Sequence, residues 1–90
     1  MIKVRIPAQL RTLTGGSGEV SVEGSTVGEA LKALDAAHAG FADRIFDEAG
    51  GLRRFVNVFL DDEDVRFLDG LATPIAAGQT LSIVPAVDGG

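Results

Sequence analysis

The residues of this 90-residue chain that are most suited to take part in a reaction are its last two glycines. Because glycine has no Cβ, Gly89 and Gly90 would leave the terminal carbonyl carbon unshielded and would fit a narrow channel. They end a segment, Ala86-Val87-Asp88-Gly89-Gly90, that we expect to be a flexible tail. Five extended residues reach about 17 Å, enough to enter the active site of another protein. We therefore expect the Gly90 carboxylate to be the reacting group.

Cysteine and histidine, two residue types that often carry catalysis or metal binding, are nearly absent. The chain has no cysteine, which excludes a thiol nucleophile, a disulfide and a cysteine metal site. Its only histidine is His38, so a multi-histidine metal site is excluded. We expect His38 to pack at the end of a helix or to place a favourable charge there, with a pH switch as the alternative. We expect no catalytic residue, no metal and no cofactor in the chain itself.

Two short motifs suggest ligand-binding loops but fail on spacing. The acidic run Asp61 to Asp64 is followed by Val65 and Arg66, where a calcium-binding loop needs an oxygen ligand and a glycine. The run is therefore typical of a solvated turn. The glycine-rich stretch 15–18 lacks the Gly-Lys-Ser/Thr ending of a phosphate-binding loop. It is predicted to be the turn of a hairpin.

The charge of the chain limits the classes of partner that it can bind. A net charge of −5 argues against nucleic acid, whose phosphates favour lysine and arginine, and against an anionic membrane surface. The sequence begins with alternating apolar and basic residues, from Met1 to Ile6, rather than with a signal peptide, and no run reaches the length of a membrane span. We expect a cytoplasmic protein that binds other proteins.

Hydrophobic periodicity predicts which elements must position the tail. Apolar residues at alternate positions predict strands, and these span residues 2–6, 19–23, 54–60, 65–67 and 81–84. Thr26 and Glu29 fit a capping box that opens one helix, which we expect to end near Gly40. A brief helical turn is expected at 41–46. The chain is thus predicted to be a single domain, residues 1–90, of the α+β class. We expect a β-grasp (ubiquitin-like) fold, in which one main helix packs on one face of a mixed sheet of about five strands.

The strand over residues 54–60 also predicts a docking face. Val56, Val58 and Leu60 alternate with two aromatic residues, Phe55 and Phe59. If the aliphatic residues pack under the helix, the aromatic residues lie on the open face of the sheet. In a β-grasp sheet the first, third and last strands are neighbours, so Lys3, Arg5, Ser82 and Val84 are expected to share that face.

We therefore expect partners to dock on Phe59, Val84, Arg5 and Phe55. An exposed apolar patch with a charged rim usually marks such a surface. The alternative is that the loops at 47–54 or 67–76 cover the aromatic residues.

The chain resembles the MoaD/ThiS family of ubiquitin-like sulfur carriers over essentially all of its length. The most specific part is the end, with the turn at Gly78, the strand 81–84, Pro85 and the final glycines. Residues 54–58, 61–67 and 70–73, with the loop at 47–52, look like the branch that supplies sulfur for bacterial cysteine synthesis. Two positions depart from the family pattern. Gln79 replaces an aspartate that often follows the turn, and Asp88 replaces a small residue beside the glycines.

The resemblance implies a chemical role for the tail. An E1-like enzyme would use ATP to adenylate the Gly90 carboxylate, and sulfur would displace AMP to leave a thiocarboxylate. Gly89 would give clearance, while Pro85 and Val87 would set the course of the tail. The acceptor would be a pyridoxal-phosphate cysteine synthase, and a metalloprotease would release the cysteine. Three alternatives stay open. The first is the small subunit of molybdopterin synthase or a carrier for another thio-metabolite, the second a modifier conjugated to lysines, and the third a non-catalytic β-grasp interaction module.

Overall fold

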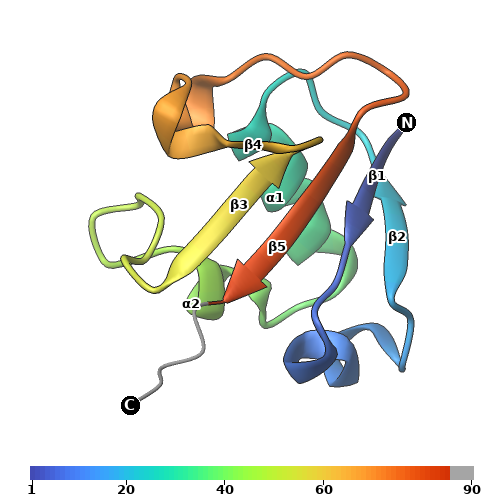
Figure 1. Ribbon diagram of the computed structural model, residues 1–90. Coiled ribbons are helices and arrows are strands. Elements are labelled where there is room, and N and C mark those ends of the chain that lie inside the picture. The colour runs from blue at the N-terminus through green and yellow to red at the C-terminus, as the bar shows by residue number, and fades with distance from the viewer. Residues whose placement is uncertain (86–90) are drawn as a thin grey trace.

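The computed structural model describes residues 1–85. Within that range the chain forms a five-stranded sheet with one long helix and several short helical segments (Figure 1). In chain order the elements are β1 (Ile2–Arg5), η1 (Ala8–Thr14), β2 (Glu19–Val22), α1 (Val27–Ala37), α2 (Phe41–Ile45), β3 (Val56–Leu60), β4 (Glu63–Asp64), η2 (Val65–Phe67), η3 (Gly70–Ala72) and β5 (Thr80–Pro85), where η denotes a 3₁₀ helix.

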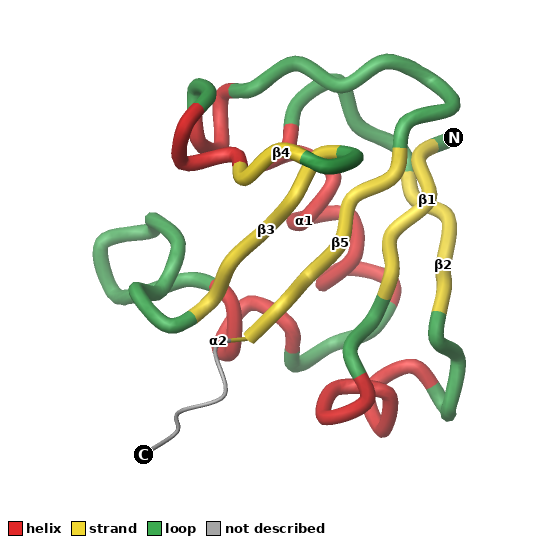
Figure 2. Tube along the Cα trace, in the orientation of Figure 1, coloured by secondary structure: helices red, strands yellow, loops and turns green. Residues whose placement is uncertain are grey.

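The strands lie in the order β2-β1-β5-β3-β4. The first and last strands of the chain, β1 and β5, are parallel neighbours at the centre, and every other pair is antiparallel. Helix α1 crosses behind this sheet, as Figure 2 shows. The strand order and the single main helix are those of the expected β-grasp architecture, so the predicted neighbours of β5 are confirmed.

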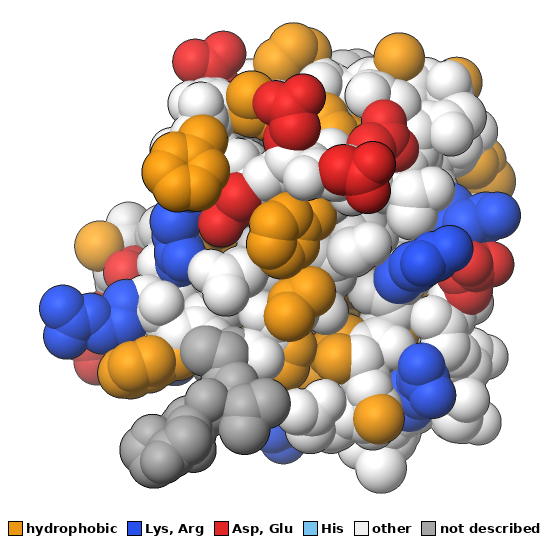
Figure 3. Space-filling view, viewed as in Figure 1, with side chains coloured by type: hydrophobic (Ala, Val, Ile, Leu, Met, Phe, Trp, Pro, Cys, Tyr) orange, Lys and Arg blue, Asp and Glu red, His pale blue; other side chains and the backbone are white. Residues whose placement is uncertain are grey.

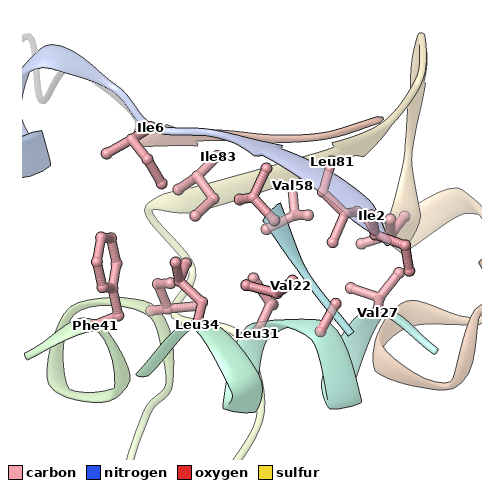
Figure 4. Close-up of a cluster of buried hydrophobic side chains, with 14 of the residues drawn as sticks. Ile2, Ile6, Val22, Val27, Leu31, Leu34, Phe41, Val58, Leu81 and Ile83 are labelled. Atoms are coloured by element: carbon pink, nitrogen blue, oxygen red, sulfur yellow. The ribbon is translucent and has the colours of Figure 1, made fainter. Parts of the chain in front are cut away.

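The hydrophobic core lies between α1 and the covered face of the sheet (Figure 4). The strands contribute alternate residues, such as Val4, Val58 and Leu81, none of which is exposed. Helix α1 contributes Leu31 and Leu34, which are equally buried because residues three or four positions apart share one face of a helix. This packing leaves the opposite face of the sheet without a helix.

Helix α1 begins where the sequence predicted and ends earlier. The Thr26 hydroxyl oxygen accepts a hydrogen bond from the backbone N–H of Glu29 at 3.2 Å, and the Glu29 carboxylate accepts one from the Ser25 N–H at 2.8 Å. These two bonds confirm the capping pair. The helix ends at Ala37 with a half-buried His38 as its C-cap. Gly40, the expected stop, has a φ of 110° and precedes α2 instead.

The prediction of a strand over residues 65–67 is wrong. That segment is the 3₁₀ helix η2, and the short strand β4 lies within the expected acidic turn. The cause is local, because the Asp64 carboxylate accepts a hydrogen bond from the Arg66 N–H at 2.8 Å and so caps a helical turn. Only Val65 then points into the core, while Phe67 is 87% exposed.

Candidate functional site

The structure positions the start of the predicted reactive tail. Gly90, Gly89, Asp88 and Val87 lie outside the described residues. Pro85 is the last residue of β5 and stands opposite Val56 in the pairing with β3. Because β5 is held between β1 and β3, the tail is anchored on the middle strand of the sheet. The lack of a proline N–H is tolerated here because Pro85 ends its strand.

Three of the four predicted docking residues lie together on the open face of the sheet. Strand pairing sets Arg5 opposite Ser82, and Ser82 opposite Phe59. Val84 is two residues beyond Ser82 and so is diagonal to Phe59, a separation that aromatic side chains can bridge. Val84 is 43% exposed and Phe59 is partly exposed. Figure 3 shows hydrophobic side chains at the surface over β3 and β5, so the loops do not cover this patch.

The fourth predicted docking residue, Phe55, does not belong to the strand. Strand β3 begins at Val56, and Phe55 lies in the preceding turn with 63% of its surface exposed. The prediction that Phe55 continues the alternation of β3 is therefore wrong. The name open face is used below for Arg5, Phe59 and Val84 alone.

Charges of both signs flank the open face. On the β1 side, the Lys3 ammonium and the Arg5 guanidinium lie 3.7 Å and 3.8 Å from the Glu19 carboxylate. Both pairs are exposed, so each contributes little to stability. On the β4 side, acidic side chains gather above the hydrophobic patch (Figure 3). An open hollow of about 380 Å³ lies between the two sides, lined by Arg5, Asp61, Asp62, Thr80 and Ser82. Such a polar hollow beside an apolar patch can receive a polar side chain from a partner.

Sequence reasoning missed the contact that fixes the beginning of β5. The Asp61 carboxylate accepts hydrogen bonds from the Thr80 N–H and from the side-chain amide of Gln79, both at 3.1 Å. The amide oxygen of Gln79 in turn accepts a bond from the Ala76 N–H at 2.8 Å. Gln79 must therefore donate and accept at once, which an ionised acid cannot do. The hydrogen bond to Asp61 therefore explains why a glutamine suits position 79, where the family often has an aspartate. The two residues are far apart in the sequence, so no sequence pattern predicted their contact.

Replacing Gln79 with glutamate is expected to lower the free energy of unfolding by about 1 kcal/mol or more. The change removes the hydrogen bond to Asp61 and sets two carboxylates against each other. Urea unfolding followed by circular dichroism measures the loss. Gln9→Glu is the matched control, because Gln9 is exposed in η1 and the charge change is the same. Equal stability of the two variants would show that the contact contributes nothing.

Two further findings concern the described part of the chain. No group of three or more histidine, cysteine, aspartate or glutamate side chains within residues 1–85 is arranged to hold a metal ion. Over the same residues, no helix combines the length and the apolar character that crossing a membrane requires.

The five-stranded mixed sheet, its single covering helix and its uncovered face define a ubiquitin-like β-grasp domain. The chain belongs to the ThiS family, which its sequence matches over residues 4–90. It is 47% identical over 91 residues to the sulfur carrier protein CysO of Mycobacterium tuberculosis, covering 99% of this chain and 98% of that protein.

Solved structures agree with this assignment. The chain superposes on CysO in the BexX/CysO complex of Amycolatopsis orientalis with a TM-score of 0.94 and 46% identity, and the whole of each chain is covered. It superposes on SAMP1 of Haloferax volcanii with a TM-score of 0.79 and 35% identity, covering 99% of this chain and 98% of that one. The relatives named CysO are sulfur carrier proteins and not enzymes.

Proposed function

We propose that this chain is a sulfur carrier whose Gly90 carboxylate is adenylated and then converted to a thiocarboxylate. The observation that carries the proposal is the 47% identity to CysO over nearly the whole of both chains. A further feature supports it, because the sequence continues past the middle strand of the sheet to Gly89 and Gly90.

The proposed chemistry needs only the terminal carboxylate from this chain. A carboxylate is a poor electrophile, so an E1-like enzyme first transfers AMP from ATP to a Gly90 oxygen and releases pyrophosphate. Sulfide, or the terminal sulfur of a persulfide, then attacks the carbonyl carbon and displaces AMP. A persulfide needs in addition a thiol reductant to free the product. The resulting thiocarboxylate is ionised at neutral pH and is a good nucleophile.

The route most consistent with the relatives is cysteine biosynthesis in the cytoplasm. The acceptor in this route is a pyridoxal-phosphate cysteine synthase, and a metalloprotease releases the finished cysteine. The Amycolatopsis CysO is found in a complex with BexX, which supports docking of this chain on a second protein. A molybdopterin synthase or another thio-metabolite enzyme as the acceptor would leave the chemistry at Gly90 unchanged.

The adenylating enzyme is proposed to dock on the open face. Phe59 and Val84 supply apolar area there, and Arg5 supplies a charge at the rim. Such a centre with a polar rim is the usual anatomy of a protein interface. Docking on this face would set the enzyme beside β5, from which the tail begins.

Replacing Phe59 with aspartate is expected to lower kcat/KM for adenylation at least about tenfold, because a central aromatic contact of an interface is replaced by a charge. The assay is pyrophosphate release in the presence of the E1-like enzyme. Phe67→Asp is the control, since Phe67 is an exposed phenylalanine of η2 that lies outside the open face. Normal adenylation by a folded Phe59→Asp variant would move the docking site elsewhere.

The test of the proposed function is the intact mass of the chain purified from cells that contain its native partners. The expected mass increase equals the difference between one sulfur and one oxygen atom, and fragmentation should locate it at Gly90. An unmodified mass, even after incubation with ATP, sulfide and E1-like enzymes, would overturn the proposal. It would favour a β-grasp interaction module with inert glycines.

A second candidate function is conjugation of Gly90 to lysine side chains. The observation that favours it is the 35% identity to SAMP1, a small archaeal modifier protein, over nearly all of both chains. Immunoblots of cell extracts against a tagged chain distinguish the two functions. A modifier gives a ladder of covalent conjugates that requires Gly90, whereas a dedicated carrier gives only the free protein.

A further inference from the structure

A second surface lies beside the first residues of β3. It consists of the turn before β3 and the η2 segment after β4, and it alternates cationic and aromatic side chains. We name it the arginine–phenylalanine strip, and its members are Arg53, Arg54, Phe55, Arg66 and Phe67. Figure 3 shows basic and hydrophobic side chains together along the side of the molecule next to β3.

Hydrogen bonds to neutral groups hold two of these guanidinium groups in place. Arg66 donates to the side-chain oxygen of Asn57 at 2.8 Å and also to the backbone carbonyl of Arg53. Arg53 donates from Nε to the backbone carbonyl of Asp43 at 3.0 Å. The two segments of the strip are therefore tied together, and their charges are already positioned for a partner, which lowers the entropic cost of binding.

The arginines of the strip form no ion pair with a carboxylate of residues 1–85, although Asp47 lines a shared hollow with Arg53 and Arg54. Among residues 1–85 the cation–carboxylate pairs within 4.0 Å are those of Lys3 and Arg5 with Glu19. Three guanidinium groups at one edge therefore lack a carboxylate at that range, in a chain whose net charge is −5. A surface of this sign fits a partner that presents carboxylates, because arginine binds them with paired N–H donors.

The aromatic side chains of the strip are the most exposed phenylalanines of the described chain. Phe67 is 87% exposed and Phe55 is 63% exposed. Exposed aromatic residues beside arginines have the composition of an interface core, which is rich in both types.

The strip also borders the point where the tail begins. Val56 stands opposite Pro85, and residues 53–55 directly precede Val56. An enzyme that draws Gly90 into its active site must approach Pro85 within the reach of the tail, about 17 Å. It therefore also approaches the strip. The open face has a different character, with an acidic run on one side and paired basic residues on the other.

We propose that the arginine–phenylalanine strip docks the acceptor enzyme, through a rim of carboxylates around an apolar patch beside that enzyme's active-site entrance. The adenylating enzyme then binds the open face, so that the two partner enzymes bind different surfaces of one carrier. This inference rests on the proposed function, because it requires that sulfur leave Gly90 for a second enzyme.

The test uses the full chain with two purified enzymes of the same organism, the E1-like enzyme and the pyridoxal-phosphate cysteine synthase. Arg54→Glu is the first variant, because Arg54 is exposed and makes no side-chain hydrogen bond within residues 1–85. We expect its Kd for the cysteine synthase to rise about tenfold or more. We expect KM for adenylation to stay within about twofold. Phe67→Ser is expected to weaken the same binding, also without an effect on adenylation.

Matched controls separate charge from structure. Lys32→Glu makes the same charge change on α1 and is expected to leave both enzymes unaffected. Arg54→Lys keeps the charge and is expected to retain most of the binding. The salt dependence of Kd should be weaker for Arg54→Glu than for the natural chain, since a screened attraction has been removed.

Three results would overturn the inference. The natural chain could fail to bind the cysteine synthase, the Arg54→Glu variant could bind it as tightly as the natural chain, or the variant could lose adenylation to the same extent. The last result would show that one shared face serves both enzymes. Because binding is measured with the unloaded chain, absence of a thiocarboxylate would count against the proposed function and not against the strip.

Discussion

Removal of Gly90 is expected to abolish sulfur loading completely and to leave the domain folded. The loss follows because the proposed reaction takes place at the Gly90 carbonyl carbon. A chain ending at Gly89 would present its carboxylate one residue, or about 3.4 Å, short of the catalytic groups of the adenylating enzyme. A displacement of even 1 Å at a reacting centre can cost about a hundredfold in rate. The measurement is intact mass after incubation with ATP, sulfide and the E1-like enzyme.

The fold should survive this truncation, because the buried apolar side chains of the described residues all lie between Ile2 and Ile83. The midpoint of thermal unfolding is expected to change by less than about 2 °C, which corresponds to a few tenths of a kcal/mol for a domain of this size. Asp88→Ala, which keeps the length of the tail, is the control and should still be loaded. A fall of many degrees on truncation would show that the tail is part of the folded structure.

Replacing Phe41 with alanine is expected to lower the free energy of unfolding by about 3–5 kcal/mol. Phe41 is fully buried, and Figure 4 shows its ring pointing toward the sheet at one end of the core. Helix α2 has only five residues and is held by such contacts rather than by its own propensity. Since small domains are stable by only about 5–15 kcal/mol, urea unfolding should reveal the loss directly.

Phe67→Ala makes the same chemical change at a site that is 87% exposed, so it should alter stability by no more than about 0.5 kcal/mol. A loss below about 1.5 kcal/mol for Phe41→Ala would mean that α2 can close the space that the ring leaves. The two large effects are also distinguishable in function. The Phe41 variant is expected to lose adenylation only through unfolding, so a stabilising osmolyte should restore its adenylation. A chain that lacks Gly90 lacks the reacting group, so an osmolyte cannot restore its adenylation.

The parts of the fold with a clear period could be predicted from the sequence. Strand β3 alternates over five residues, and its buried positions, Val56, Val58 and Leu60, are those that the alternation selects. The same logic placed Phe59 and Val84 on the open face once the strand order was known. The capping pair of α1 was readable because Thr26 and Glu29 interact within one turn.

Short and non-local features could not be predicted in this way. Three residues are too few to separate the two-residue period of a strand from the three-residue period of a 3₁₀ helix, and the side chain of Asp64 decides between them at η2. The bonds that join Arg66 to Asn57 and Gln79 to Asp61 link residues nine and eighteen positions apart. No periodicity signals such pairs, so the strip and the start of β5 became visible only in three dimensions.

The position of β5 has a consequence for how the chain folds during its synthesis. Among the strands of residues 1–85 it is the last to be synthesised, yet it fills the centre of the sheet between β1 and β3. Until residues 80–85 have left the ribosome, β1 and β3 have no strand between them, and the nascent chain cannot close its core. Such long-range pairing is slow to form. An interrupted translation product should therefore stay unfolded and be degraded, so no folded carrier accumulates that could occupy an enzyme without offering a tail.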